Sequence, residues 1–141
     1  MYQRDYILRM IEMLAQLIAA ILKYIKSGDL SKASQSLQSA YSMVFHDEVP
    51  KLRSLPEEGM IDTLLQEYLY TNGHLEMLAE LFYADAELLL AEKKIPESLS
   101  YYRKSLTLLE YIDKEYKSYS RERQDRIMAV RERLKDDSLK T

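Results

Sequence analysis

The sequence predicts an all-α protein, and three observations carry that prediction. Residues with high helix propensity, namely Leu, Ala, Glu, Lys, Met, Arg and Gln, dominate the chain. Glycine and proline occur three times each in 141 residues, too few for the frequent turns of β-sandwiches and barrels. Apolar residues recur at i, i+3, i+4 and i+7 along most of the chain. We expect one domain that buries about two thirds of its unfolded surface.

The first predicted hairpin spans about residues 3–45. Its first helix is apolar on almost every side between residues 17 and 25, so neighbours must cover more than one of its faces. Gly28 can adopt positive φ and end this helix. Asp29 can then cap a second helix over about residues 30–45.

The middle of the chain separates two hairpins. Residues 46–54 contain Pro50 and show no clean periodicity, so we expect an irregular connection there. A short helix over about residues 55–71 follows, opened by a capping box at Ser54–Glu57. Asn72-Gly73 is expected to form a left-handed stop before the next helix.

The second predicted hairpin spans about residues 74–116. Residues 95–97, Ile-Pro-Glu, open its second helix with a proline and an acid in the first turn. A last helix over about residues 120–136, capped by Ser118 or Ser120, has a thin apolar stripe and covers an otherwise exposed end. Its alternating charges are typical of a solvated, ion-paired helix. Together these segments predict a bundle of about five to six antiparallel helices.

A small–large–small pattern occurs twice, at a constant offset along the chain. The first copy follows Gly28-Asp29-Leu30 and the second follows Lys94-Ile95; the six residues are Ala33, Leu37 and Ala40, then Ser98, Tyr102 and Ser105. Residues at i, i+4 and i+7 share one helical face, and small side chains there let a neighbouring helix approach closely. The two segments, about residues 14–45 and 79–112, resemble tetratricopeptide-repeat helical hairpins. The resemblance implies a protein-binding role.

The sequence also departs from that family's pattern. Tryptophan is absent, Lys93 replaces glycine at the second turn, and Asp85 falls where an apolar residue is expected. Because solenoids normally stack about three or more repeats, two hairpins predict a compact bundle and not a long superhelix. The opening segment, residues 2–12, also resembles a family of short, uncharacterised bacterial helical proteins, which implies no activity.

Composition excludes several classes of partner. With a net charge of −3, the protein lacks the positive field that binding to a phosphate backbone requires, so we expect no nucleic-acid partner. Cysteine is absent, which excludes disulfides and thiolate chemistry. The most apolar run, residues 13–22, is about half as long as a membrane span, and the first residues do not resemble a signal peptide. We therefore expect a cytoplasmic protein without a membrane partner.

No pattern of residues predicts an active site. Neither His46 nor His74 has a glutamate three residues before it, as a carboxylate-bridged metal bundle would need. The chain also lacks Gly-x-Ser-x-Gly and any glycine-rich phosphate loop. We expect no catalytic residue, no metal, no cofactor and no enzymatic activity.

The resemblance to tetratricopeptide hairpins implies a concave groove lined by the first helix of each hairpin. The residues expected to face it are Glu80, Tyr83, Glu87 and Leu90 in the second hairpin and Ala15, Ile18, Leu22 and Lys26 in the first. An acidic, tyrosine-bearing groove would favour a basic or amphipathic peptide. The alternative is that Glu80 and Glu87 are simply solvated.

Tyrosine is unusually abundant, with 12 residues against two phenylalanines and no tryptophan. Tyrosine suits half-buried positions and interfaces. At the start of the first helix, few elements remain to cover the apolar side chains, so we expect an oligomer contact, and a homodimer, through Tyr2, Tyr6, Met10 and Met13.

The sequence thus predicts a non-enzymatic protein–protein interaction or scaffold module. Its motivation is the repeated hairpin, the excess of tyrosine and the lack of catalytic motifs. The alternative is a sensor or regulatory protein that binds a small apolar or aromatic ligand between its helices.

Overall fold

A computed structural model of the chain describes residues 2–116 and 118–139, all of whose regular elements are helical. The all-α prediction is confirmed. The long helices are α1 (Tyr2–Lys26), α2 (Leu30–Phe45), α5 (Asn72–Ala91), α6 (Ile95–Glu115) and α7 (Arg121–Lys135). Between α2 and α5 lie a 3-10 turn (His46–Glu48), α3 (Val49–Arg53) and α4 (Met60–Gln66); a 3-10 turn at Asp137–Leu139 ends the described chain.

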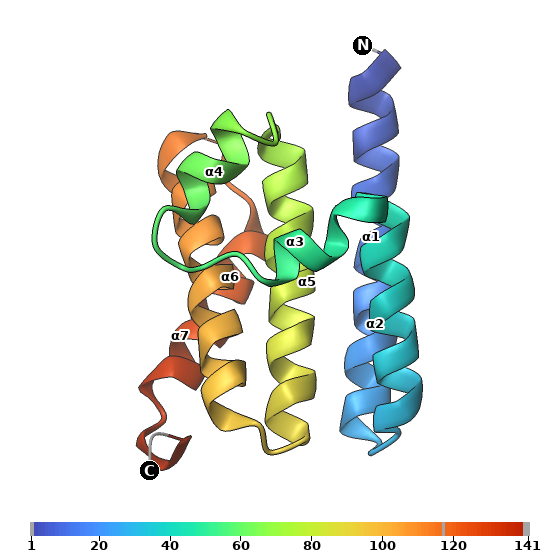
Figure 1. The fold of residues 1–141 in the computed structure, drawn as a ribbon, viewed down its shortest axis with the longest axis vertical. Helices are drawn as coiled ribbons and strands as arrows, with labels where there is room; N and C mark the ends of the chain where they lie inside the picture. The colour runs from blue at the N-terminus through green and yellow to red at the C-terminus, as the bar shows by residue number, and fades with distance from the viewer. Residues whose placement is uncertain (1, 117, 140–141) are drawn as a thin grey trace.

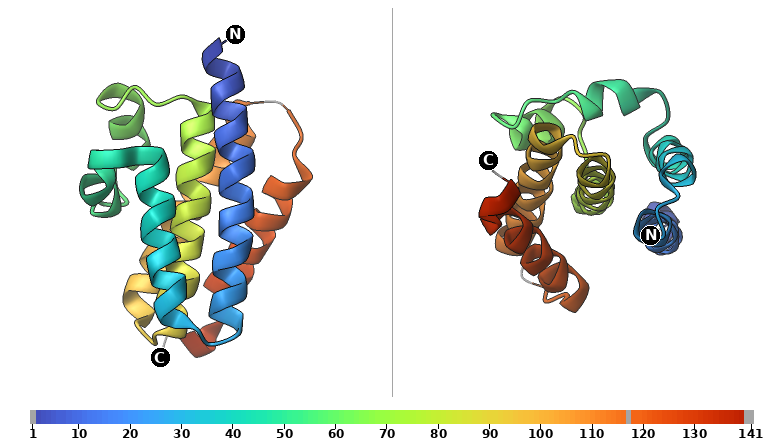
Figure 2. Two further views of the ribbon diagram at one scale, coloured as in Figure 1. Left: turned by 90° about the vertical axis from the view of Figure 1, so that its right-hand side faces the viewer. Right: turned by 90° about the horizontal axis from the view of Figure 1, so that it is seen from below.

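The helices form an arch around α5. Helices α1 and α2 make one antiparallel hairpin and α5 and α6 a second, and α7 packs on α6 (Figure 1). Seen along the helices, α1 and α7 stand at the two ends of the arch and α5 lies between them (Figure 2). Both α1 and α2 also pack on α5.

The central position of α5 explains its composition. Neighbouring helices cover most of its surface, so it carries apolar residues on nearly every side instead of one stripe. Its buried residues are Leu75, Met77, Leu78, Ala79, Leu81, Phe82, Tyr83, Ala84, Asp85, Ala86 and Leu88.

The repeated small–large–small residues all lie in helix seams. Ala33, Leu37 and Ala40 and their counterparts Ser98, Tyr102 and Ser105 are at most 1% exposed. The two serines do more than save space, because each hydroxyl donates a hydrogen bond of 2.8 Å to a backbone carbonyl of α5, at Ala86 and Ala79. The polar hydroxyls of Ser98 and Ser105 therefore have hydrogen-bond partners, although they occupy buried positions that the first copy fills with alanine.

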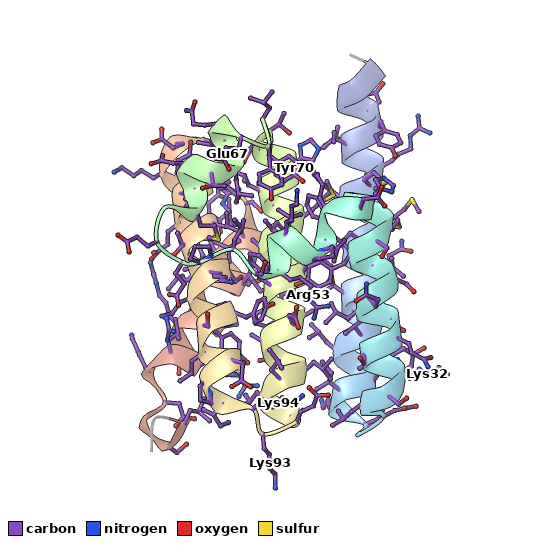
Figure 3. The ribbon with its side chains drawn as sticks, in the orientation of Figure 1. Lys32, Arg53, Glu67, Tyr70, Lys93 and Lys94 are labelled. Carbon is purple, nitrogen blue, oxygen red and sulfur yellow. The ribbon has the colours of Figure 1, made fainter. Side chains whose placement is uncertain are left out.

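The first turn forms as predicted, and the second follows it despite its lysine. Gly28 has a φ of 84°, and the Asp29 carboxylate accepts a hydrogen bond of 3.2 Å from the N–H of Lys32. Lys93 takes the same left-handed conformation, with a φ of 64°, and its side chain points away from the bundle (Figure 3). A non-glycine residue in this region costs about 1 kcal/mol.

Two predictions for the middle of the chain are wrong. Residues 46–54 are not irregular, since they form the 3-10 turn and α3. Ser54–Glu57 does not open a helix: α4 begins only at Met60, after Gly59 with a φ of 73°. The Glu57 carboxylate binds the Arg103 guanidinium of α6 at 2.8 and 3.0 Å and is not available for a cap.

The predicted stop at Asn72-Gly73 is also wrong, because α5 begins at Asn72. The left-handed residue before α5 is Leu69, with a φ of 55°. Gly73 instead permits close packing with α1, since a Cβ atom there would lie 2.4 Å from the Ile7 Cγ2 atom.

Asp85 anchors the two hairpins to each other and to the connection. Its carboxylate, on α5, accepts a hydrogen bond of 2.6 Å from the Tyr41 hydroxyl of α2. The Arg53 guanidinium of α3 binds the same carboxylate through Nε and Nη2, at 3.1 and 3.0 Å, from a side chain that is one third exposed. Arg53 also accepts a hydrogen bond of 2.9 Å on its carbonyl from Tyr101 of α6.

Burial and ion pairing act in opposite directions on this group. Asp85 is 1% exposed, and burial raises the pKa of its carboxyl, whereas Arg53 and Tyr41 act to lower it. A buried carboxylate without a partner would cost several kcal/mol. Asp85, which interrupts the apolar pattern of α5, therefore needs the positive charge of Arg53 beside it.

We predict that His74 makes stability depend on pH near neutrality. Its Nδ1 atom accepts a hydrogen bond of 3.2 Å from the Thr71 N–H at the start of α5, and its ring stacks on Tyr70. Burial lowers the pKa of His74 below its usual 6.5, while Glu48 acts to raise it. The folded pKa lies below the unfolded one, so folding favours the neutral ring. The contribution of neutral His74 to the free energy of unfolding is therefore complete above about pH 6.5 and is lost as the pH falls through the folded pKa.

The variant His74→Gln tests this, since its amide oxygen can still accept the Thr71 N–H but does not titrate. Urea unfolding at about pH 7.5 and about pH 5.5 should show a larger fall in the free energy of unfolding for the native chain than for the variant. Equal falls would contradict the prediction.

Candidate functional site

A groove of about 410 Å³ runs between α1, α5 and α7, on the inner side of the arch. Helix α1 forms one wall, α7 the other, and α5 the floor, with one residue from α6. The lining residues are Ile11, Leu14, Ala15, Ala19 and Leu22; Glu76, Met77 and Glu80; Leu109; and Ser120, Glu122, Arg123 and Arg126. The volume lies within the range of ligand-binding clefts.

The α1 wall is apolar and has a shallow centre. Leu14, at the base of this wall, is 1% exposed and belongs to the core, but Ala15 and Ala19 are exposed. These alanines lie one turn apart on one face, between Ile11 and Leu22. Their small side chains leave the surface of α1 open to close approach by another molecule.

The α7 wall is charged and tied to α5. The Arg126 guanidinium binds the Glu80 carboxylate at 2.8 and 2.9 Å and lies 4.1 Å from the centre of the Tyr83 ring. Arg123 is 6% exposed and binds Glu76 at 3.4 Å and Asp113 of α6 at 3.1 Å. The groove is therefore apolar on one side and polar on the other.

Burial changes the acidity of two of these groups. Burial raises the pKa of the Glu76 carboxyl, and Arg123 acts to lower it. For Arg126, burial acts to lower the pKa of the guanidinium, but the hydrogen bonds to Glu80 leave it above its ordinary value. Arg126 therefore stays charged.

The contacts between α5 and α7 form a regular ladder. Arg126 binds Glu80, and one rung further along, Arg133 binds Glu87 at 3.0 and 3.3 Å. Each pair is separated by 46 residues in the chain. The separation is constant because α5 and α7 run in the same direction, with α6 returning between them (Figure 1).

The residues predicted to face a groove are found in three places. Leu22, Glu80 and Ala15 line the groove. Ile18 is 1% exposed and belongs to the core, and Lys26 lies exposed at the end of α1. Tyr83, Glu87 and Leu90 lie where α5 packs against α6 and α7: Tyr83 is 7% exposed, Glu87 accepts a hydrogen bond from Tyr102, and Leu90 packs in the same cluster.

These positions change the interpretation of the acidic face. Glu80 and Glu87 were expected either to attract a peptide or to be solvated, but both bind arginines of α7. Of the two, only Glu80 lines the groove.

The residues predicted to form an oligomer contact also divide. Tyr6 and Met13 are 57% and 52% exposed on α1, whereas Met10 is 8% exposed and packs in the protein's own core. The side chain of Tyr2 lies outside the described residues.

Sequence reasoning missed the arginines of the groove. Residues 121–135 suggested a solvated helix, yet Arg123 is nearly buried and Arg126 crosses to another helix. One signal was available: the spacing between Glu80 and Glu87 equals that between Arg126 and Arg133, as two parallel helices in contact would require.

The described residues contain no cluster of three or more His, Asp or Glu side chains placed to hold a metal ion. Among the same residues, no helix combines the length and the apolar character needed to cross a membrane.

Comparison of the chain with protein-family models, with curated proteins and with solved structures finds no match. The resemblance to tetratricopeptide repeats therefore rests on the sequence pattern alone.

We predict that the Arg126–Glu80 pair contributes measurably to holding α7 on α5. The pair is bidentate and both side chains are less than one third exposed. A double-mutant cycle with Glu80→Gln and Arg126→Met, measured by urea unfolding, should give a coupling energy of about 1 kcal/mol.

The matched control is the Arg131–Glu110 pair, which joins α7 to α6 with side chains 50% and 47% exposed. Its cycle should give at most about 0.3 kcal/mol, because solvent screens an exposed pair. Equal coupling in the two cycles would contradict the assignment.

Proposed function

We propose that the protein is a non-enzymatic interaction module whose groove binds an amphipathic helix of a protein partner. The observation that supports this most directly is the division of the groove, with an apolar α1 wall facing a charged α7 wall. An amphipathic helix lays its apolar face on such a wall and keeps its polar face toward the other.

The spacing along α1 favours a helix as the ligand. Ile11, Ala15, Ala19 and Leu22 make a continuous stripe about 16 Å long, or three helical turns. Bulky residues stand at its ends and small ones in its middle. A second helix packed along α1 would bring its own large side chains over the alanines.

The charges favour a partner with basic residues. Three glutamates and two arginines line the groove, namely Glu76, Glu80, Glu122, Arg123 and Arg126. A carboxylate has two oxygens and about four acceptor sites, so Glu76 and Glu80 can accept a further lysine or arginine without giving up their arginines. The charged side of the groove, formed by α5 and α7, therefore contributes specificity, and the apolar α1 wall contributes most of the affinity.

A small-ligand sensor is the second candidate, because the volume of the groove suits one. An apolar molecule would lie on the α1 wall. A carboxylate on that molecule would have to displace Glu76 or Glu80 from the arginines, which already have acidic partners. We therefore prefer a helical peptide.

A designed peptide with the chemistry that the groove favours tests the proposal. The probe is a fluorescein-labelled helix of about 18 residues with a Leu/Ala stripe and lysine flanks, and the comparison peptide carries glutamate in place of lysine. We predict that the basic peptide binds at micromolar concentration in an anisotropy titration and that the acidic one binds at least tenfold more weakly.

The variants Ala15→Trp and Met128→Trp locate the binding. Both residues are exposed, but Ala15 lines the groove and Met128 lies outside it. Ala15→Trp fills the groove and should weaken binding of the basic peptide at least tenfold. Met128→Trp should leave this binding unchanged. Equal binding by both variants, or none by the native chain, would contradict the proposal; stabilisation by long-chain amphiphiles alone would favour the sensor.

A further inference from the structure

We propose that the groove binds its helical partner antiparallel to α1, with acidic residues in the first turn of the partner helix and basic residues in its last turns. This inference rests on the proposed function and goes beyond it, because it fixes the direction of the partner helix and the order of its charges. The class of partner is thereby narrowed to amphipathic helices whose basic residues lie at their C-terminal end.

The three helices that form the groove run in the same direction (Figure 1). Gly73, near the start of α5, lies against Ile7 of α1, and Leu22, near the end of α1, packs in the cluster of Tyr83, so α1 and α5 advance together. The two ladder pairs between α5 and α7, each separated by 46 residues, show the same for these helices. A helix in the groove therefore lies either parallel or antiparallel to all three.

The helix dipoles favour the antiparallel direction. The groove lies along the first turns of α5 and α7, since its residues there are within 76–80 and 120–126 and these helices begin at Asn72 and Arg121. Each helix N-terminus carries about half of an elementary positive charge. An antiparallel partner places its own C-terminus, which carries the opposite partial charge, beside these two N-termini. A parallel partner would place its positive end there.

The charged side chains change sign along the groove, and the end where α5 and α7 begin is acidic. Here Arg123 binds both Glu76 and Asp113, and Glu122 is exposed and forms no ion pair with any residue that the structure describes. These three carboxylates and one guanidinium have a net charge of −2. The other charged residues of the same helix ends, within 4–12 and 114–125, sum to +1 and leave this end acidic. Basic residues of the partner therefore belong at this end.

The opposite end of the groove is basic. Leu22 is the last residue of α1 in the groove, and Lys23 and Lys26 follow it in the last turn. Lys26 is exposed and lies four residues beyond Leu22, so it continues the groove face of α1. The ion pairs beside these lysines are neutral, and the other charges of the helix ends, within 29–32, 92–97 and 132–140, sum to −1. Acidic residues in the first turn of an antiparallel partner are favoured by these lysines and by the partner's own dipole.

Leu8 extends the apolar wall one turn beyond the groove. It is 49% exposed and lies three residues before Ile11 and seven before Ala15, on the same face of α1. From Leu8 to Lys26 this face spans about 27 Å. A partner helix of about 18 residues has the same length and reaches from one charged end to the other.

Single cysteines measure the direction, because the chain has none of its own. The probe is the lysine-flanked peptide described above, with one cysteine at its N-terminus or its C-terminus, and the chain carries Leu8→Cys or Lys26→Cys. Under mild oxidation, the C-terminal cysteine should cross-link to Leu8→Cys about tenfold faster than the N-terminal one, and the order should reverse at Lys26→Cys. Met128→Cys, outside the groove, should cross-link slowly to both peptides.

The outcomes of this experiment separate the inference from the proposed function. If the peptide binds in the anisotropy titration but its N-terminal cysteine reacts faster with Leu8→Cys, the antiparallel direction is wrong and the binding function remains supported. Equal rates for the two cysteines would overturn the direction in the same way. If no peptide binds, the proposed function is wrong, and this inference is wrong with it.

A second experiment tests the order of the charges. Two peptides of equal composition carry glutamates in the first turn and lysines in the last, or the reverse. Because the first order also makes the free peptide more helical, its advantage in binding is compared between the native chain and variants. This advantage should fall about threefold in Glu122→Lys and stay unchanged in Glu132→Lys, an exposed acid of α7 outside the groove. An unchanged advantage in Glu122→Lys would overturn the charge order.

Discussion

One buried charge constrains the architecture of this protein. Asp85 lies in the middle of the most buried helix, at a position where a helical hairpin repeat would carry an apolar side chain. A carboxylate in such a place needs partners, and it receives them from two other elements: Tyr41 of α2 and Arg53 of α3. The part of the connection that carries Arg53 is helical, and α3 holds this guanidinium over the buried carboxylate.

The groove follows from the same arrangement. The network at Asp85 holds the first hairpin against one side of α5, and α6 holds α7 on the other. Helices α1 and α7 are thereby kept apart with α5 as the floor between them (Figure 2). Arg123 and Arg126 of α7 bind glutamates of α5, which fixes the charged wall opposite the alanines of α1.

Local chemistry allowed much of the fold to be predicted. Helix periodicity, Gly28 and Asp29 gave the first hairpin and its turn, and Ile95-Pro96-Glu97 gave the start of α6. The predictions that failed depend on contacts between residues distant in the chain. Glu57 has the sequence context of a capping residue, but Arg103 competes for it. Gly73 has the context of a stop, but Ile7 requires it inside a helix.

The candidate site was predictable only in part for the same reason. Ala15, Leu22 and Glu80, expected at a groove because of the resemblance to tetratricopeptide hairpins, do line one, but Ile18, expected on the same face, lies in the core. Arg123 and Arg126 could not, because alternating charges on a helix look the same whether they pair with solvent or with a neighbouring helix. Glu87 was misplaced since α7, whose position the sequence does not show, packs over it.

The most direct test of this account is the urea unfolding of Arg53→Met at about pH 7 and about pH 5. We expect the variant to lose about 3 kcal/mol of unfolding free energy at pH 7, because the charged Asp85 carboxylate loses its ion pair and keeps only the Tyr41 hydroxyl as a partner in the core. Burial already raises the folded pKa of Asp85 in the native chain, and removing Arg53 raises this pKa further, so the loss relative to the native chain should shrink as the pH falls. A loss below about 1 kcal/mol, with the same pH dependence as the native chain, would contradict it.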